Sequence, residues 1–192
     1  MLSLKERIEM LESDLTADPP RVSVYHDMPF AILWYRPADE WVMRKEVNLL
    51  ASRLQDHGKN VRMISMAELL WEAIDRSEGM DVLVNLERVM GFEEAQKQVR
   101  TYLSDPDYMP LRDLLADRLR DLDPRRDVAF LIRAASMAPA IYPMSRLLNE
   151  MHGRTMVTII LFYPGTLEGT TGLRFMDLKD REVHGNYRVK IY

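Results

Sequence analysis

The feature that most constrains this chain is an uncharged apolar run at residues 156–163, inside the segment TMVTIILFYPG. β-Branched and aromatic residues dominate the run. About 8 apolar residues bounded by turn residues are typical of a strand buried on both faces. A buried helix is the competing interpretation, but the run is short for a helix, and Pro164 with Gly165 predicts its end. We therefore expect a central β-strand that stops at residues 163–165.

Four other segments predict strands. Residues 30–35 (FAILWY) are a second apolar run without charge, and residues 127–132 (DVAFLI) are a third candidate for a buried strand. Residues 61–64 predict a short strand, and residues 187–192 alternate as an edge strand does. Between them, apolar residues recur at helical spacing within residues 4–15, 39–57, 65–76 and 144–151. Strands that alternate with helices indicate an α/β fold, with a mainly parallel central sheet of about five strands and helices on both faces.

The middle of the chain lacks any strand pattern. Residues 79–123 carry apolar stripes at helical spacing, and we expect a helical insertion whose helices pack on each other or cover one edge of the sheet. The helix predicted within residues 1–18 is followed by Pro19 and Pro20. It either docks on its own sheet or joins a neighbouring chain. The length predicts a single α/β domain over residues 1–192 that includes both additions.

Composition excludes several classes of protein. Hydrophobic residues make up 47% and charged residues 29%, so 192 residues can bury a core without disulfides or metals. The sequence has no cysteine, no signal-peptide pattern and no run near the roughly 18 apolar residues of a membrane span. We expect a cytoplasmic, soluble protein without membrane contact. A net charge of −4 argues against broad binding to nucleic acid.

Sequence motifs for phosphate, metal and nucleophile chemistry are absent. No GxxxxGK[ST], GxGxxG or GxSxG pattern occurs. The histidines lie in separate segments, form no HxxxH or HExxH pair, and have no cysteine to complete a zinc site; they are His26, His57, His152 and His184. We therefore expect no catalytic residue, no bound metal and no cofactor.

One loop keeps a candidate binding site. Ligands of parallel α/β sheets bind beyond the carboxyl ends of the strands, and residues 166–175 follow the central strand. Glycines there allow a partner or a phosphate to approach closely, and an arginine can pair with an anion. The candidate binding residues are Tyr163, Gly165, Gly169 and Arg174. The competing interpretation, which the sequence favours, is a flexible loop with an exposed arginine.

Several short motifs occur together in this chain. They are FYPG at residues 162–165, LRF at 173–175 and NYR at 186–188, preceded by FAIL at 30–33, PADE at 37–40, LLASRL at 49–54 and AELLW at 67–71. This set resembles the BrxB family of bacterial BREX (bacteriophage exclusion) phage-defence systems. The resemblance extends over residues 28–192.

The resemblance implies a non-catalytic, cytoplasmic subunit that acts through protein–protein interaction. The implied partner is PglZ, the alkaline-phosphatase-superfamily member of these systems, within an assembly that also contains an ATPase and a DNA methyltransferase. Two alternatives are a degenerate nucleotide-binding or enzymatic α/β domain and a DNA-contacting accessory protein. Acidic residues among the arginines of residues 117–127 weaken the last alternative, because they cancel the local field. Homodimerisation stays open.

Overall fold

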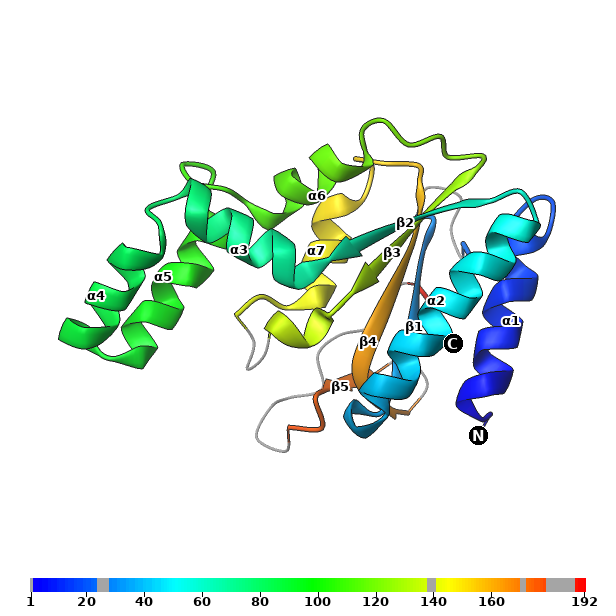
Figure 1. Cartoon of the computed structure of the whole chain (residues 1–192), viewed down its shortest axis with the longest axis horizontal. Coiled ribbons are helices and arrows are strands. Elements are labelled where there is room, and N and C mark those ends of the chain that lie inside the picture. The colour runs from blue at the N-terminus through cyan, green and yellow to red at the C-terminus, as the bar shows by residue number, and fades with distance from the viewer. Residues whose placement is uncertain (1, 24–27, 138–140, 170–171, 179–188) are drawn as a thin grey trace.

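A six-stranded sheet forms the centre of the computed structural model, which describes residues 2–23, 28–137, 141–169, 172–178 and 189–192 (Figure 1). Five strands follow the order β2-β3-β4-β1-β6 and pair in parallel, while β5 pairs antiparallel with β4. The strands are β1 (Phe30–Tyr35), β2 (Asn60–Ser65), β3 (Asp127–Ile132), β4 (Thr158–Glu168), β5 (Gly172–Phe175) and β6 (Lys190–Ile191). The expectation of a mainly parallel α/β sheet is confirmed.

Helices cover both faces of this sheet, as expected. Helices α1 (Leu4–Thr16) and α2 (Glu40–Asp56) share one apolar core with the sheet, and helices α3 (Met66–Arg76), α6 (Leu111–Leu119) and α7 (Met144–Met151) share another on the opposite face. Helices α4 (Met80–Met90) and α5 (Phe92–Ser104) form a hairpin that projects away from the sheet (Figure 1). Short 3-10 turns follow β1 (η1, Pro37–Asp39) and β3 (η2, Ala134–Met137).

Strand β4 lies at the centre of the sheet, between β3 and β1. Ile159 and Ile160 are both fully buried, but Ile159 joins the core under α6 and α7 while Ile160 joins the core under α1 and α2. Successive residues of a strand point to opposite faces, so burial of both requires cover on both sides. The central placement of this run is confirmed.

The expected end of this strand is wrong. β4 begins at Thr158, which leaves Met156 outside it and 55% exposed, and it continues past Pro164 and Gly165 to Glu168. At Pro164, opposite Tyr35, the strand makes its last pairing with β1 and then pairs with β5. Because proline lacks only the amide hydrogen, its carbonyl still accepts a bond from the Met176 amide at 2.9 Å. The chain therefore changes partners without ending the strand.

Helix α1 docks on its own sheet. Ile8, Leu11 and Leu15 are buried in the core that α1 shares with α2 and the sheet. The helix begins with a capping box between Ser3 and Glu6, in which each residue's side chain accepts the other's backbone amide. This arrangement supports the interpretation in which the helix completes the core of its own chain.

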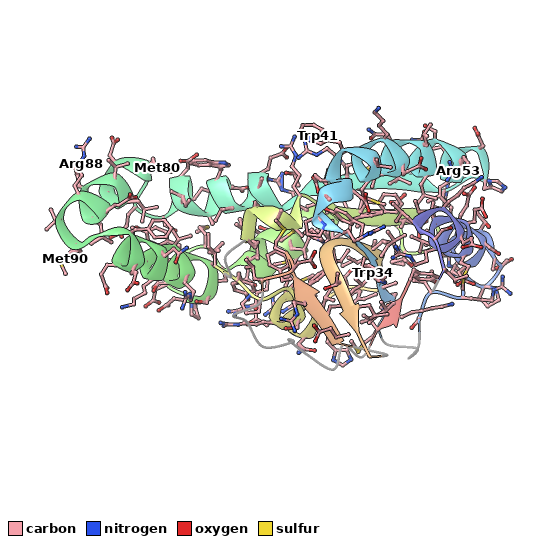
Figure 2. All side chains as sticks on the ribbon, turned by 90° about the horizontal axis from the view of Figure 1, so that it is seen from below. Trp34, Trp41, Arg53, Met80, Arg88 and Met90 are labelled. Atoms are coloured by element: carbon pink, nitrogen blue, oxygen red, sulfur yellow. The ribbon has the colours of Figure 1, made fainter. Side chains whose placement is uncertain are left out.

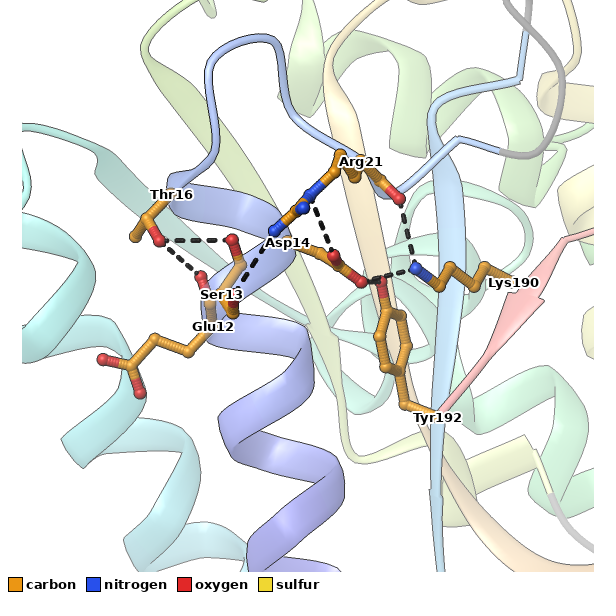
Figure 3. Close-up of polar contacts among 7 residues, drawn as sticks. All are labelled: Glu12, Ser13, Asp14, Thr16, Arg21, Lys190 and Tyr192. Atoms are coloured by element: carbon orange, nitrogen blue, oxygen red, sulfur yellow. Dashed lines mark hydrogen bonds and ion pairs between the residues drawn. The ribbon is translucent and has the colours of Figure 1, made fainter.

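A polar cluster also holds α1 against β6 (Figure 3). The Asp14 carboxylate accepts hydrogen bonds from Lys190 Nζ at 2.5 Å and from the Tyr192 hydroxyl at 2.7 Å. Arg21 Nε lies 3.4 Å from the same carboxylate. Burial raises the pKa of Asp14, but the hydrogen bonds from Lys190 and Tyr192 and the nearby cations outweigh it, and the pKa lies below its ordinary value.

We expect Asp14→Asn to lower the free energy of unfolding by about 1–2 kcal/mol at neutral pH, because the amide loses the ionic bonds. The pKa of Asp14 is lower in the folded chain than its ordinary value of 3.8, so the carboxylate's contribution is present above that value and is lost as pH falls through the folded pKa. Urea unfolding at several pH values checks this. A stability difference between the two proteins that stays constant from neutral pH to pH about 3 would contradict it.

Candidate functional site

The predicted strand-end loop is a β-hairpin formed by β4 and β5 in place of a flexible loop. Tyr163 is buried and packs edge-to-face on Phe175, with ring centroids 5.3 Å apart. Arg174 Nε donates to Glu168 Oε1 at 2.5 Å, which neutralises the cation that sequence reasoning left for an anion. Thr170 and Thr171, which complete the glycine-rich segment, lie outside the described residues, as do residues 186–188.

The two candidate glycines of this hairpin have different surroundings. Gly165 pairs with Phe175 of β5, and an added Cβ would overlap the Arg174 carbonyl oxygen and approach the Tyr163 ring to 2.9 Å. Gly169 adopts a φ of +65° at the end of the hairpin, with open space where a Cβ would stand. The structure thus brings Tyr163, Gly165 and Arg174 together and sets Gly169 apart. A binding role for the four residues stays a prediction.

A cavity of about 180 Å³, here called the carboxyl-end pocket, lies where the parallel strands β1 and β3 end, between α2 and the face of the sheet that α2 covers. Tyr35 ends β1, Arg133 follows β3, and Phe162 comes from β4, while the first turns of α2 supply Glu40 and Arg44. Met43 and Val47 of α2 add apolar wall. The pocket therefore joins apolar walls to a few polar groups at the sheet edge where ligands of α/β proteins bind.

Hydrogen bonds fix the polar groups at one side of this pocket. The Tyr35 hydroxyl donates to Glu40 Oε2 at 2.5 Å, and Arg44 Nε donates to Glu40 Oε1 at 2.8 Å. Burial raises the pKa of Tyr35 and the Glu40 carboxylate raises it further, so the phenol stays protonated. The Arg44 guanidinium also lies over the Trp41 ring, 4.6 Å from its centroid. Glu40 is therefore held by two donors.

Arg133, at the other side, has an uncommon backbone conformation. Its φ is +59°, in the left-handed region that residues other than glycine rarely adopt. Its carbonyl accepts bonds from the amide of Ser136 at 3.1 Å and from the Ser136 hydroxyl at 2.9 Å, which begin the η2 turn. Among the described residues its guanidinium has no hydrogen bond or ion pair. The sequence pattern predicted the strand at residues 127–132 but no site at its end; the signal was an arginine immediately after a buried strand.

The free end of the α4–α5 hairpin is a second exposed feature. Val89, Met90 and Phe92, here called the hairpin tip, are 80%, 60% and 59% exposed. Figure 2 shows Met90 and Arg88 at the end of the molecule farthest from the sheet. Three exposed apolar side chains within four successive residues are typical of a surface that binds another protein.

The described ranges contain no group of three or more His, Cys, Asp or Glu residues placed to hold a metal ion. Of the four histidines, His26 and His184 lie outside these ranges. No described helix is long and apolar enough to cross a membrane.

Comparison with known proteins identifies the family. The family model described as BREX protein BrxB matches residues 62–191, from β2 through β6. The chain belongs to the BrxB family. A relative from Bacillus cereus (strain H3081.97), named BREX protein BrxB, is 23% identical over 166 residues, which cover 85% of this chain and 84% of the relative. No solved structure matches the chain.

Family membership makes this chain the BrxB component of a BREX anti-phage defence system. The resemblance inferred from the FYPG, LRF and neighbouring motifs is confirmed. The matched range includes the α4–α5 hairpin and Arg133, whereas Tyr35 and the first turns of α2 precede it. Other BREX components are therefore the proteins among which its partners are to be sought.

Proposed function

We propose that this BrxB component acts by contact with another protein rather than by catalysis, and that it docks through the hairpin tip. The observation that carries the proposal is the exposure of Val89, Met90 and Phe92 at the end of a projecting helical hairpin. A fold has no internal need for such a patch, because exposed apolar surface costs free energy in water.

The base of the hairpin, unlike its tip, has a buried core. Ile74 of α3, Leu83 of α4 and Tyr102 of α5 are buried in a small separate core. Glu78 reinforces it by accepting hydrogen bonds from the Tyr102 hydroxyl at 2.6 Å and from Gln98 Nε2 at 3.2 Å. Leu83 is the only residue of α4 buried in this way. The hairpin is thus anchored near α3, and its far end is left for a partner.

The chemistry of the tip fits a protein partner. Glu87, Arg88 and Glu93, which are next to the apolar residues of the tip in the sequence, are all exposed. An apolar centre with a charged rim of mixed sign matches a protein–protein interface, whereas a nucleic acid would need a clustered positive charge. The BREX resemblance implies the PglZ-like, alkaline-phosphatase-superfamily protein of the same system as this partner, and we propose it as the occupant of the tip.

Co-purification of the tagged protein with the PglZ-like protein from the same system tests the proposal. We expect the double variant Val89→Asp, Phe92→Asp to lower partner recovery at least about tenfold, because two buried charges would each remain unpaired in the interface. The thermal unfolding midpoint should stay unchanged, since both side chains are exposed in the free chain.

Leu49→Asp is the matched control, because Leu49 is a 53% exposed apolar residue of α2, away from the hairpin. We expect it to bind as the unaltered chain does. Undiminished recovery of the PglZ-like protein by the double tip variant would refute docking through the tip. Equal loss in the Leu49→Asp variant would assign the effect to general surface charge instead.

A further inference from the structure

We infer that the carboxyl-end pocket binds a small organic anion, with Arg133 as the residue that pairs with its charge. The ligand class is a carboxylate or phosphate attached to a compact apolar body. This inference is independent of docking through the hairpin tip, because the pocket lies at the sheet edge and the tip lies at the far end of α4–α5.

The position of the pocket follows from the chain's path. After β1 the chain turns into α2, which covers one face of the sheet, and after β3 it turns into η2 and α7, which pack on the other face. The pocket lies on the α2 side of this change of face, where the first turns of α2 meet the ends of β1 and β3 and Phe162 of β4. Such a change of face is where α/β sheets bind ligands.

The charges around the pocket favour an anion. Glu40 is the acidic lining residue, and it already accepts hydrogen bonds from the Tyr35 hydroxyl and from Arg44. Arg133 adds a second cation, which has no hydrogen bond or ion pair to any described residue. Two guanidinium groups and one carboxylate leave an excess of one positive charge. A ligand carboxylate or phosphate matches the planar fork of a guanidinium.

The apolar walls and the size of the pocket restrict the rest of the ligand. Met43, Val47 and Phe162 provide carbon surface that is otherwise part of the core under α2. A volume of about 180 Å³ is below the roughly 300–1,000 Å³ of pockets for drug-sized ligands. A single aromatic ring or a short acyl chain fits it, whereas a whole nucleotide is too large.

The backbone of Arg133 supports a role for its side chain. An L-residue with φ near +59° is strained by its Cβ, and glycine would avoid this strain. The η2 turn needs the left-handed conformation, because the Arg133 carbonyl must face both the amide and the hydroxyl of Ser136. Nothing in that turn needs a guanidinium. Residues with a strained backbone are frequent at ligand-binding sites, where the function of the side chain offsets the cost of the conformation.

The test uses three probes that separate charge from apolar contact: benzoate, its neutral isostere benzamide, and inorganic phosphate. Binding to the full chain is measured by NMR titration. We expect benzoate to bind in the millimolar range, at least about tenfold tighter than benzamide or phosphate. Arg133→Gly should weaken benzoate at least about tenfold while raising the thermal unfolding midpoint, since it removes the cation and relieves the strained φ.

Asp177→Gly is the matched control, because Asp177 also has a positive φ, +56°, outside the pocket. It should leave benzoate binding unchanged. Arg133→Asn, whose short side chain tolerates the left-handed region, provides a second variant and should lose binding as Arg133→Gly does. Absence of benzoate binding, equal binding of benzamide, or full binding by both Arg133 variants would overturn the inference. Phosphate binding equal to benzoate would overturn the apolar part of the ligand class.

Discussion

Ile160→Asp is expected to prevent folding of this chain. Ile160 is fully buried in the middle of the sheet, with Phe130 and Ala31 as its neighbours on the adjacent strands. Its side chain packs among the apolar residues of the core that α1 and α2 share with the sheet, so an aspartate there would be a buried, unpaired charge. The cost exceeds about 4 kcal/mol, which is a large part of the 5–15 kcal/mol that stabilises a typical domain.

The same substitution at Ile159 probes the other face and should also fail to fold, because Ile159 is fully buried in the core under α6 and α7. Met156→Asp is the control, since Met156 precedes the strand and is largely exposed. Circular dichroism and thermal unfolding check the three variants. A cooperative unfolding transition in either isoleucine variant would contradict the central position of β4.

Gly165→Ala is expected to destabilise the β4–β5 hairpin by about 3 kcal/mol or more, because a methyl group would overlap the backbone carbonyl of Arg174. Relief requires a shift of the β5 backbone, which would disturb the contact of Tyr163 with Phe175. Urea unfolding measures the loss in stability, and hydrogen exchange of the β5 amides shows whether it is local.

Gly169→Ala distinguishes steric overlap from backbone strain. Gly169 has a positive φ but open space around the missing Cβ, so alanine should cost only about 1 kcal/mol. The expected order is therefore a severe effect at residue 165 and a mild one at residue 169. A larger loss of stability at residue 169 than at residue 165 would show that β5 does not pass as close to Gly165 as described.

Local sequence pattern predicted the elements that a single run of residues can specify. The buried runs at residues 30–35 and 127–132 match β1 and β3 to the residue, because charged residues or proline flank each run. Helix α2 could be predicted for a similar reason, since its apolar residues recur at helical spacing and form the buried side of the helix. These strands and this helix are specified by residues close to one another in the sequence, so a local pattern is enough to predict them.

Features that depend on distant partners could not be predicted. Proline and glycine at 164 and 165 indicate an end to any strand viewed alone, and only the arrival of β5 on the far side of Gly165 lets β4 continue. The apolar stripe of α4 predicted burial, yet of its residues only Leu83 is buried, because the helix packs on α5 away from the sheet. An apolar stripe predicts that a helix has a side suited to burial, but it does not predict which element will pack against that side.

The carboxyl-end pocket was not predicted from the sequence, for a geometric reason. The motif that could be recognised consists of residues close in sequence, and they lie together because β4 and β5 form a hairpin; they are Tyr163, Gly165, Gly169 and Arg174. The carboxyl-end pocket combines Tyr35, Arg133 and Phe162 from three strands, and it can be recognised only once their order in the sheet is known.

The strand order also has a consequence for how the chain is made. β1 lies between β4 and β6, so both of its neighbours come from residues 158–191, more than 120 residues after it. While a ribosome is still producing the middle of the chain, the apolar FAILWY segment has no strand to pair with on either side. Late pairing of this kind makes folding slow and leaves the growing polypeptide open to aggregation. The nascent chain therefore has to keep β1 protected until its last strands emerge.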